Sequence, residues 1–501
     1  MSRTAVKHEQ FTWTRERLHS LITKRLEGFR FICVANREPY IHVAGPRGIR
    51  CVEPDSGVVT ALDPVMRATG GTWIAHGSGS ADRETADLHG RLRVPPARPH
   101  YTLRRVWLTP EEERGYYYGF SNEGLWPLCH IAYQRPVFRD RDWKQYEAVN
   151  QSFADAVVEE IGGERALVFI QDYHFALLSK LIKQRVPGAI VCQFWHIPWP
   201  NPEAFRICPW TREVLEGMLG NDLLAFHTQN HCNNFIDSID REIESRIDRE
   251  SFSITLRGSH TAIRPHPISV DFDAISASSQ SQSTRDRITA LQDHYRLNGL
   301  AVLLAVGRMD YTKGILERVQ AVDRLLELHP GLIEKVALLE IGVRSRSEIA
   351  AYSNFQEQVE SHIQAVNKRH RTAAWEPITL VREHQDQHTL TALYRLADVC
   401  LVTSLHDGMN LVAKEYVAAR ADEQGALVLS HFTGAARELT QALLVNPYAV
   451  DGMAETIWRA LSMPVEEQRC RMRRMREVIR EHNVYRWAGK LLEQAARLEP
   501  S

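Results

Sequence analysis

Short apolar runs alternate with longer amphipathic segments along the whole chain. An apolar run followed by a segment that is apolar on one side only is typical of a buried strand and its crossover helix in a parallel sheet. The predicted strands fall into two groups of five: 31–35, 72–76, 167–171, 190–194 and 223–226, then 302–306, 336–341, 378–381, 399–402 and 426–429. The pattern therefore predicts an α/β fold.

Two domains are predicted rather than one, because 501 residues exceed what a single hydrophobic core normally organises. Between the two groups of strands lies Arg264-Pro265-His266-Pro267-Ile268-Ser269-Val270, whose prolines suit a linker. We predict two doubly wound, Rossmann-like domains facing each other across a cleft, over 1–268 and 269–482. Residues 466–496 are predicted to be helical, and the Ser- and Gln-rich stretch 276–284 to be a loop.

The overall composition is that of an ordinary soluble protein, with 44% hydrophobic residues, 25% charged residues and a net charge of −1. This balance argues against nucleic acid or an anionic membrane as the main partner. The eight cysteines form no CxxC pair and no zinc-type spacing, as expected in a reducing compartment. Residues 1–10 are polar and no apolar window is long enough to span a membrane, so we predict a cytoplasmic protein.

A helix N-terminus is predicted in the second domain, shortly after the strand 399–402. The sequence there is Asp407-Gly408-Met409-Asn410-Leu411-Val412-Ala413-Lys414-Glu415-Tyr416. Unpaired N–H groups at such a terminus bind phosphate, and the helix dipole strengthens the attraction. Carboxylates beside it can accept hydrogen bonds from sugar hydroxyls. The alternative is an ordinary capped helix with an exposed acid.

Two cations follow the strand 302–306 in the run Gly307-Arg308-Met309-Asp310-Tyr311-Thr312-Lys313-Gly314. Arg308 and Lys313 leave the carboxyl end of that strand, where ligands bind in open α/β sheets. Together with a helix N-terminus, they would make a diphosphate site that needs no metal. A surface loop with solvated charges is the alternative.

Six further motifs follow one order along the chain: Asn36-Arg37, Tyr117, Asn122-Glu123-Gly124-Leu125-Trp126-Pro127, Gln171-Asp172-Tyr173-His174, His196-Ile197-Pro198-Trp199-Pro200, and Arg346 ahead of Tyr352. With the two segments above, they resemble the trehalose-6-phosphate synthase family of retaining nucleotide-sugar glycosyltransferases. The resemblance extends over roughly residues 29 to 495. It implies the GT-B architecture, in which a C-terminal helix, here 483–501, packs back on the N-terminal domain.

The resemblance implies transfer of glucose from a nucleotide-diphosphate glucose, UDP-glucose in this reading, to glucose 6-phosphate. The product would be trehalose 6-phosphate, a precursor of the compatible solute trehalose and so of osmoprotection. The residues implied in catalysis are Asp172, His196, Arg308, Lys313 and Asp407. The residues implied in donor binding are Gly57, His196, Arg308, Lys313, Asp407, Gly408, Met409, Asn410, Leu411, Val412 and Glu415.

The residues implied in acceptor binding are Arg37, His76, Tyr117, Trp126, Asp172 and Arg346. Arg37 and Arg346 would grip the acceptor phosphate, since a guanidinium is suited to bidentate phosphate contacts. Tyr117 and Trp126 would line the sugar, although an aromatic pair at this spacing is more often part of a core. His196 would contact the donor glucose, and its alternative is a satisfied histidine beside a Pro-rich turn.

We expect no metal and no cofactor, since the nucleotide sugar is a co-substrate. Asp140-Arg141-Asp142 has a metal-binding form, but it is better explained by capping of a predicted helix. His384 and His388 have no clear third ligand in the sequence. The basic run 469–474 alternates with apolar residues and predicts a solvated helix face.

The expected partners are small-molecule substrates and a separate phosphatase, since the chain shows no DxDxT phosphatase motif. A homo-oligomer is compatible with the sequence. The sequence does not determine the nucleotide base of the donor or the regulation of the protein.

Two positions depart from the family pattern. Ser56-Gly57-Val58 stands where two glycines are usual, and His76 stands where a Trp is usual. In addition, Arg37-Glu38-Pro39-Tyr40 resembles glucosylglycerol-phosphate synthases, which use glycerol 3-phosphate, whereas Arg346 favours glucose 6-phosphate. A non-catalytic sugar-phosphate sensor is a third reading.

Overall fold

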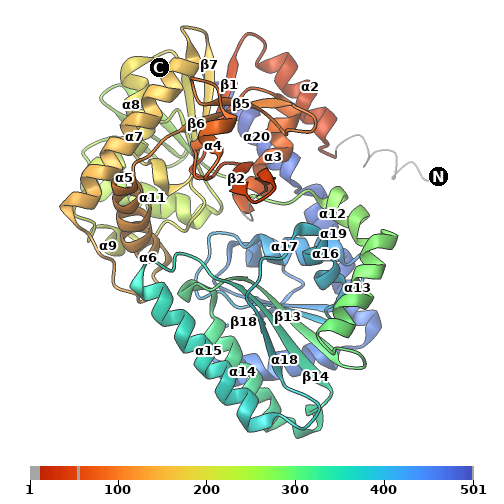
Figure 1. Ribbon diagram of the computed structural model, residues 1–501. Coiled ribbons are helices and arrows are strands. Elements are labelled where there is room, and N and C mark those ends of the chain that lie inside the picture. Colours follow the sequence, from red (N-terminus) through yellow and green to blue (C-terminus); the bar gives the residue numbers. More distant parts are fainter. Residues whose placement is uncertain (1–11, 54–56, 499–501) are drawn as a thin grey trace, which may run out of the picture. The chain divides into compact units, whose positions relative to one another are not determined.

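The computed structural model describes residues 12–53 and 57–498. The chain divides into two compact units (Figure 1), which we call the N-unit, residues 1–268 with 484–501, and the C-unit, residues 269–483. Both are built on largely parallel sheets with crossover helices, so the predicted α/β fold class is confirmed. None of the helices that the structure describes has the length and apolarity needed to cross a bilayer.

The N-unit contains a ten-stranded sheet with the order β10-β11-β12-β9-β8-β7-β1-β4-β6-β5. Its parallel strands are β1 (Arg30–Val34), β4 (Thr72–His76), β6 (Tyr101–Val106), β7 (Ala166–Gln171), β8 (Ile190–Phe194), β9 (Leu223–Phe226) and β12 (Ser259–Pro265). Antiparallel strands β5 (Arg91–Val94), β10 (Arg246–Asp248) and β11 (Ser253–Leu256) complete it. A separate hairpin pairs β2 (Ile41–Gly45) with β3 (Gly48–Val52).

Helices connect these strands and include one that returns from the end of the chain. They are α2 (Arg15–Arg25), α3 (Gly57–Thr69), α4 (Asp82–Thr85), α5 (Pro110–Glu113), η1 (Arg114–Leu125), α6 (Trp126–His130), α7 (Asp140–Ile161), η2 (Tyr173–Phe175), α8 (Leu178–Arg185), α9 (Pro202–Phe205), α10 (Thr211–Met218), α11 (Gln229–Glu242) and α20 (Val484–Ala495).

The returning helix α20, blue in Figure 1, packs against α2 and α3 near the beginning of the chain. Trp487 is buried, with its ring 5.2 Å from Phe194 and 5.9 Å from Phe169. A Cβ at Gly489 would lie 2.1 Å from the ring of Trp13, so this position needs a glycine. The helix therefore completes the apolar core of the N-unit.

The C-unit contains a six-stranded parallel sheet with the order β15-β14-β13-β16-β17-β18. Its strands are β13 (Ala301–Arg308), β14 (Val336–Val343), β15 (Ile378–Val381), β16 (Val399–Val402), β17 (Ala426–Ser430) and β18 (Leu443–Val445). Its helices are α12 (Phe272–Ser279), α13 (Gln282–His294), η3 (Tyr311–Lys313), α14 (Ile315–Leu328), η4 (Pro330–Leu332), α15 (Ala350–His370), α16 (Gln387–Leu396), α17 (Leu411–Ala419), η5 (Gly434–Arg437), α18 (Val450–Leu461) and α19 (Val465–Glu481).

Each sheet changes its winding direction once, and ligands of open α/β sheets bind at such a point. In the N-unit the change lies between β1 and β7, because β4 follows β1 on one side and β7 adds on the other. In the C-unit it lies between β13 and β16. The loops that leave these four strands are therefore the first places to look for a site.

Three local predictions are wrong. The stretch 276–284 is not a loop: α12 runs to Ser279, and Ser281 caps α13 by accepting a hydrogen bond from the Thr284 amide. The predicted linker begins too early, because Arg264 and Pro265 still belong to β12. The C-terminal helical segment is not continuous, because His482 and Asn483 separate α19 from α20.

Candidate active site

The two loops at the switch point of the C-unit meet through an ion pair. Lys313 lies in the loop after β13, and its Nζ donates to Oδ2 of Asp407 at 2.6 Å. The same carboxylate oxygen accepts from Ser404 Oγ and from Asn410 Nδ2, each at 3.2 Å. Three donors thus hold the Asp407 carboxylate in one orientation beside a cation.

A close backbone approach locks these two loops together. Gly314 has φ +61°, and a Cβ there would lie 2.0 Å from the carbonyl oxygen of Thr403. The Thr403 hydroxyl donates to the Gly314 carbonyl at 3.1 Å and accepts from Arg318 at 2.6 Å. Arg318 is itself held by two hydrogen bonds of 2.8 and 2.7 Å to the buried Glu340. The contact needs a glycine, and a buried ion pair supports it.

The helix predicted at Asp407 begins four residues later than expected. Asn410, at φ 96°, is the N-cap of α17, and its side-chain oxygen accepts from the Ala413 amide at 3.2 Å. Asp407, Gly408 and Met409 form the loop before this helix. Gly434 of η5 packs against the loop so closely that a Cβ at Gly434 would lie 2.1 Å from the Gly408 carbonyl oxygen. Leu411 and Val412 open the helix, so their N–H groups are those that a helix leaves for an anion.

Glu415 lies one turn inside α17 and is buried. Its Oε2 accepts a hydrogen bond of 2.8 Å from the hydroxyl of Tyr394 on α16. The tyrosine hydroxyl thus holds the Glu415 carboxylate in a fixed orientation, and a carboxylate can accept more than one hydrogen bond.

Asp310 is a buried carboxylate that the sequence prediction did not single out. Burial by itself raises the pKa of Asp310, but the positive charges of Arg308, Arg346 and Lys313 outweigh it, so this pKa lies below its usual value. Arg346 lies 3.6 Å from Asp310 Oδ2 and donates to the Tyr352 hydroxyl at 2.6 Å. Its side chain is only 4% exposed. The positive charges of three residues of the C-unit therefore act on one buried carboxylate.

The switch point of the N-unit carries Asp172 and, one strand away, His196. Asp172 has the strained backbone angle φ 74°, and its Oδ1 accepts from the amides of Tyr173 at 2.9 Å and His196 at 3.2 Å. The His196 Nε2 lies 2.9 Å from Gln171 Oε1, and its carbonyl oxygen lies 2.9 Å from His227 Nε2. Desolvation lowers the pKa of His196 to about 3, so its ring is neutral near pH 7.

Arg37 lies in the loop after β1, and His76 is the last residue of the neighbouring strand β4. Arg37 is exposed, whereas His76 is buried, and burial lowers the pKa of its ring to about 4. The His76 amide donates to the Asn36 carbonyl at 3.2 Å, and the Asn36 side-chain oxygen accepts from Tyr116 at 3.0 Å. The loops after β1 and β4 therefore begin side by side.

The two predicted aromatic residues lie in different surroundings. Tyr117 belongs to the π-helix η1, a form that is frequent at functional sites, and its partly exposed ring stacks on His174 at 5.6 Å. Trp126 is buried, with its ring 4.1 Å from His130 and 5.9 Å from Tyr173. Trp126 is thus mainly a core residue, the alternative that its spacing had left open.

Among the residues that the structure describes, the remaining positions that the sequence singled out show no contact that indicates a binding site. Gly57 is the first residue of α3, and Ser56 lies outside the described residues. Asp140 starts α7 as predicted, but no side chain caps that helix, and Asp142 instead pairs with Arg139 at 2.9 Å. His384 precedes α16 whereas His388 lies within it, so they do not share a helix face. Among residues 12–53 and 57–498, no group of three or more His, Cys, Asp or Glu side chains could hold a metal ion.

Comparison with known proteins identifies the family of this chain. Residues 30–497 match the model of glycosyltransferase family 20. A trehalose-6-phosphate synthase of Mycolicibacterium vanbaalenii is 37% identical over 484 residues, which cover 95% of this chain and 98% of that protein. A bifunctional trehalose-6-phosphate synthase/phosphatase of Thermoproteus tenax is 36% identical over 469 residues, which cover 91% of this chain but only 62% of that protein.

Among solved structures, one similar chain is an alpha,alpha-trehalose-phosphate synthase (UDP-forming) from Burkholderia xenovorans in complex with glucose-6-phosphate. The TM-score is 0.83 at 31% sequence identity, and the match covers 93% of this chain and 99% of that chain. The likeness thus extends over both units.

Proposed function

We propose that this chain, which belongs to glycosyltransferase family 20, moves glucose from UDP-glucose to glucose 6-phosphate with retention at the anomeric carbon and so makes trehalose 6-phosphate. The observation that carries the proposal is the Lys313–Asp407 ion pair at the switch point of the C-unit, in which Asp407 lies in the loop that leads into α17. The positive charge of Arg308 acts together with that of Lys313 on the nearby Asp310 carboxylate. The similar proteins named above, one of them UDP-forming and one bound to glucose 6-phosphate, support this choice of substrates.

The C-unit is the proposed donor side. Departure of the nucleoside diphosphate places negative charge on its phosphate oxygens, and fixed positive charges stabilise that charge best. Arg308, Lys313 and the first amides of α17 supply them, so we propose a reaction that needs no metal. Asp407 would accept hydrogen bonds from the glucose hydroxyls, and Glu415 from the ribose.

The reaction exchanges one bond for another. The bond between the glucose anomeric carbon and the diphosphate oxygen breaks, and a bond to the acceptor's hydroxyl oxygen forms on the same face. The hydroxyl proton passes to the departing phosphate oxygen. His196 takes part as a neutral hydrogen-bonding group, because its lowered pKa keeps the ring uncharged. No carboxylate of this chain is needed as a covalent nucleophile.

Arg37 and Arg346 are the proposed phosphate ligands, and Asp172 the ligand of the sugar hydroxyls. Asp172 suits this role because it is partly exposed and held in a strained conformation by two backbone amides. His76 and Tyr117 are the proposed lining, and Trp126 supports that lining from the core.

Glycerol 3-phosphate is the second candidate acceptor, because His76 stands where the family usually has a Trp. Two residues of the Arg37–Tyr40 run give little support to glycerol 3-phosphate as the acceptor. Glu38 and Tyr40 are buried, and their side chains form hydrogen bonds with other residues of the N-unit.

A donor-by-acceptor matrix tests the proposal. UDP-glucose and ADP-glucose are each combined with glucose 6-phosphate and glycerol 3-phosphate, and the products are identified by mass spectrometry and by NMR of the anomeric proton. We expect α,α-trehalose 6-phosphate and free UDP. Transfer to glycerol 3-phosphate alone would move the assignment to the second acceptor, and donor binding without UDP release would indicate a sensor.

A further inference from the structure

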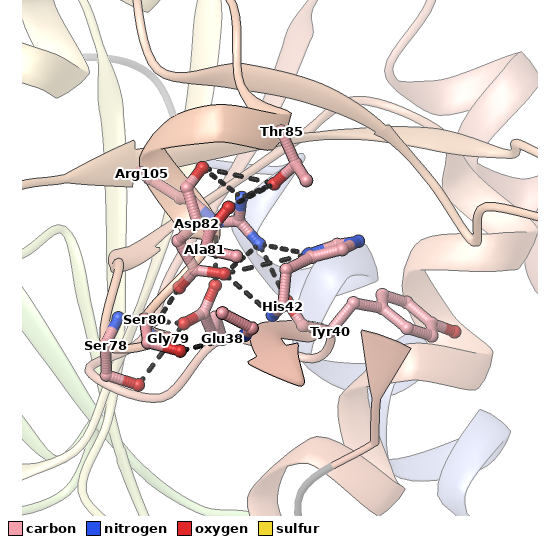
Figure 2. Close-up of polar contacts among 11 residues, drawn as sticks. Glu38, Tyr40, His42, Ser78, Gly79, Ser80, Ala81, Asp82, Thr85 and Arg105 are labelled. Atoms are coloured by element: carbon pink, nitrogen blue, oxygen red, sulfur yellow. Dashed lines mark hydrogen bonds and ion pairs between the residues drawn. The ribbon is translucent and has the colours of Figure 1, made fainter. Parts of the chain in front are cut away.

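A buried polar cluster (Figure 2), which we call the Arg105 cluster, contacts the loop after β1 and the loop after β4. It consists of Arg105, Glu38, Asp82 and His42. Arg105 lies on β6 and Glu38 in the loop after β1, while His42 belongs to the hairpin strand β2 and Asp82 to α4. The side chains of Arg105, Glu38 and Asp82 are fully buried.

Every nitrogen of the Arg105 guanidinium has a partner. Nε donates to Glu38 Oε2 at 2.8 Å, and one terminal nitrogen donates to the Asp82 carbonyl at 2.9 Å and to the Thr85 hydroxyl at 3.0 Å. The other terminal nitrogen reaches the Tyr40 carbonyl at 3.0 Å, His42 Nδ1 at 2.8 Å and Asp82 Oδ1 at 2.8 Å. One side chain thus binds two segments, residues 38–42 and 82–85, that are far apart in the sequence.

The two carboxylates pass this contact on to backbone amides. Glu38 Oε1 accepts from the Ser78 amide at 2.9 Å, which joins the loop after β1 to the loop after β4. Asp82 accepts from the amides of His42 at 2.7 Å and Gly79 at 2.6 Å. Figure 2 shows these bonds converging on the same small volume.

The loop after β4 has no room for a side chain at either of its two glycines. A Cβ at Gly79 would lie 2.4 Å from the His42 carbonyl oxygen and 2.7 Å from Asp82 Oδ1. A Cβ at the preceding Gly77 would lie 2.4 Å from the ring of Trp107. The loop therefore follows the cluster closely.

The cluster is a poor device for stability alone. Burying ionised groups carries a large desolvation penalty, and apolar residues of similar volume often stabilise a protein equally well. Here one guanidinium faces two carboxylates, and burial together with the Asp82 carboxylate raises the pKa of Glu38 to about 8 despite the attraction of Arg105. What the cluster does provide is a fixed geometry for two loops.

We infer that Arg105 is a positioning residue for acceptor binding, which acts through Glu38 and Asp82 to hold the loop of Arg37 and the loop that follows His76 in their binding geometry. Glu38 is the direct neighbour of Arg37, and Ser78 lies two residues after His76. This inference rests on the acceptor roles proposed above for Arg37 and His76. It assigns a function to charged residues that do not touch the substrate themselves.

Arg105→Lys tests the inference, because lysine keeps the charge but loses the planar fork that reaches several partners. Arg104→Lys is the matched control. Arg104 is adjacent on β6, and its side chain binds Glu159 at 3.0 Å and lies 3.6 Å from Glu160, both on α7. The full chain is assayed with UDP-glucose and whichever phosphorylated acceptor the wild-type protein uses, and each substrate is varied in turn.

We expect Arg105→Lys to raise the KM of the phosphorylated acceptor about 10-fold or more, because small misplacement of binding groups has large effects. The KM of UDP-glucose should change less than about 2-fold, and Arg104→Lys should leave both constants unchanged. Glu38→Gln, which keeps the shape but replaces one acceptor oxygen by an NH₂ group, should produce the same pattern more weakly. A wild-type acceptor KM in folded Arg105→Lys, or equal changes in both KM values, would overturn the inference.

Hydrogen exchange provides a readout that does not depend on the proposed activity. In Arg105→Lys, amides of residues 36–42 and 77–82 should exchange about 10-fold faster or more, while those of β7 keep their wild-type rates. Unchanged exchange in the two loops would refute the positioning role even if the wild-type protein proved to use another substrate. If neither Arg105→Lys nor Glu38→Gln folds, the cluster is an element of stability and the inference is wrong.

Discussion

Lys313 and Asp407, which are 94 positions apart in the chain, form a 2.6 Å ion pair between the two loops at the switch point of the C-unit. Their side chains are 19% and 14% exposed, so the pair is shielded but still within reach of a ligand. The pair holds a cation and a carboxylate in fixed positions before any substrate arrives.

Removing the cations should therefore impair catalysis more than folding. We expect Lys313→Ala and Arg308→Ala each to reduce kcat about 100-fold or more, because each removes charge stabilisation that grows in the transition state. Lys335→Ala, at an exposed position before β14, is the control and should keep wild-type activity. Steady-state release of UDP measures the effect, and near-normal turnover of a folded Lys313→Ala would show that the donor site is assigned wrongly.

Metal removal should leave the reaction intact, because protein cations and a helix N-terminus take the part of a metal ion. Activity measured after dialysis against excess EDTA should equal that of the untreated protein. Loss of activity that Mg²⁺ or Mn²⁺ restores would contradict this prediction and would direct attention back to Asp140 and Asp142.

Gly314→Ala should destabilise the C-unit, because φ is +61° at this position and the new Cβ would meet the Thr403 carbonyl oxygen at 2.0 Å. We expect a loss of about 1–3 kcal/mol in the free energy of unfolding and a lower Tm. Gly331→Ala is the matched control, since its φ is not positive and nothing lies within 4 Å of the added Cβ. Equal melting temperatures for the two variants would mean that the loops can separate freely.

Arg346→Ala should weaken acceptor binding in particular. Loss of a charge-assisted contact corresponds to about 1.5–3 kcal/mol, which is roughly a 10- to 100-fold rise in the KM of glucose 6-phosphate. The KM of UDP-glucose should rise much less. Arg344→Ala, at an exposed position two residues earlier, serves as the control. If the donor KM changes most, Arg346 belongs to the donor side together with Asp310.

Glu38 makes the stability of the N-unit depend on pH. The folded protein keeps the Glu38 proton up to about pH 8, whereas the unfolded chain releases it near its ordinary pKa of 4.5. Between these values the unfolded state binds fewer protons, so the free energy of unfolding falls as the pH rises. Glu38→Gln should make this fall smaller by about 1 kcal/mol or more, whereas Glu250→Gln, at an exposed position, should not. Denaturant titrations from pH 5 to pH 9 measure the slope, and identical slopes for wild type and Glu38→Gln would contradict the prediction.

The strands that the sequence predicted were those with continuous apolar runs. All ten are present, because a strand covered on both faces must be apolar throughout. The hairpin of β2 and β3 was missed, since β3 is exposed along its whole length and has no apolar run. Strand β6 was missed because its sequence, Tyr-Thr-Leu-Arg-Arg-Val, places the buried Arg105 inside the sheet.

The candidate site was predictable only in parts. Arg308, Lys313 and Asp407 were found because each follows an apolar strand, and the structure shows Lys313 and Asp407 in direct contact. Asp310 was overlooked, although its position between Arg308 and Lys313 in the sequence could have indicated an acid that pairs with nearby cations. The Arg346–Asp310 contact could not be foreseen, because it depends on the register of β13 and β14 rather than on a local pattern.

The return of α20 to the N-unit affects how the protein is made. The ring of Trp487 fills a space against Phe169 and Phe194, yet this helix is synthesised only after the entire C-unit. During synthesis on the ribosome, the N-unit sheet therefore keeps the apolar surface that α20 will cover exposed while more than two hundred further residues are added. The C-unit is one continuous segment and can mature during that interval, so the unit that is begun first is the one completed last.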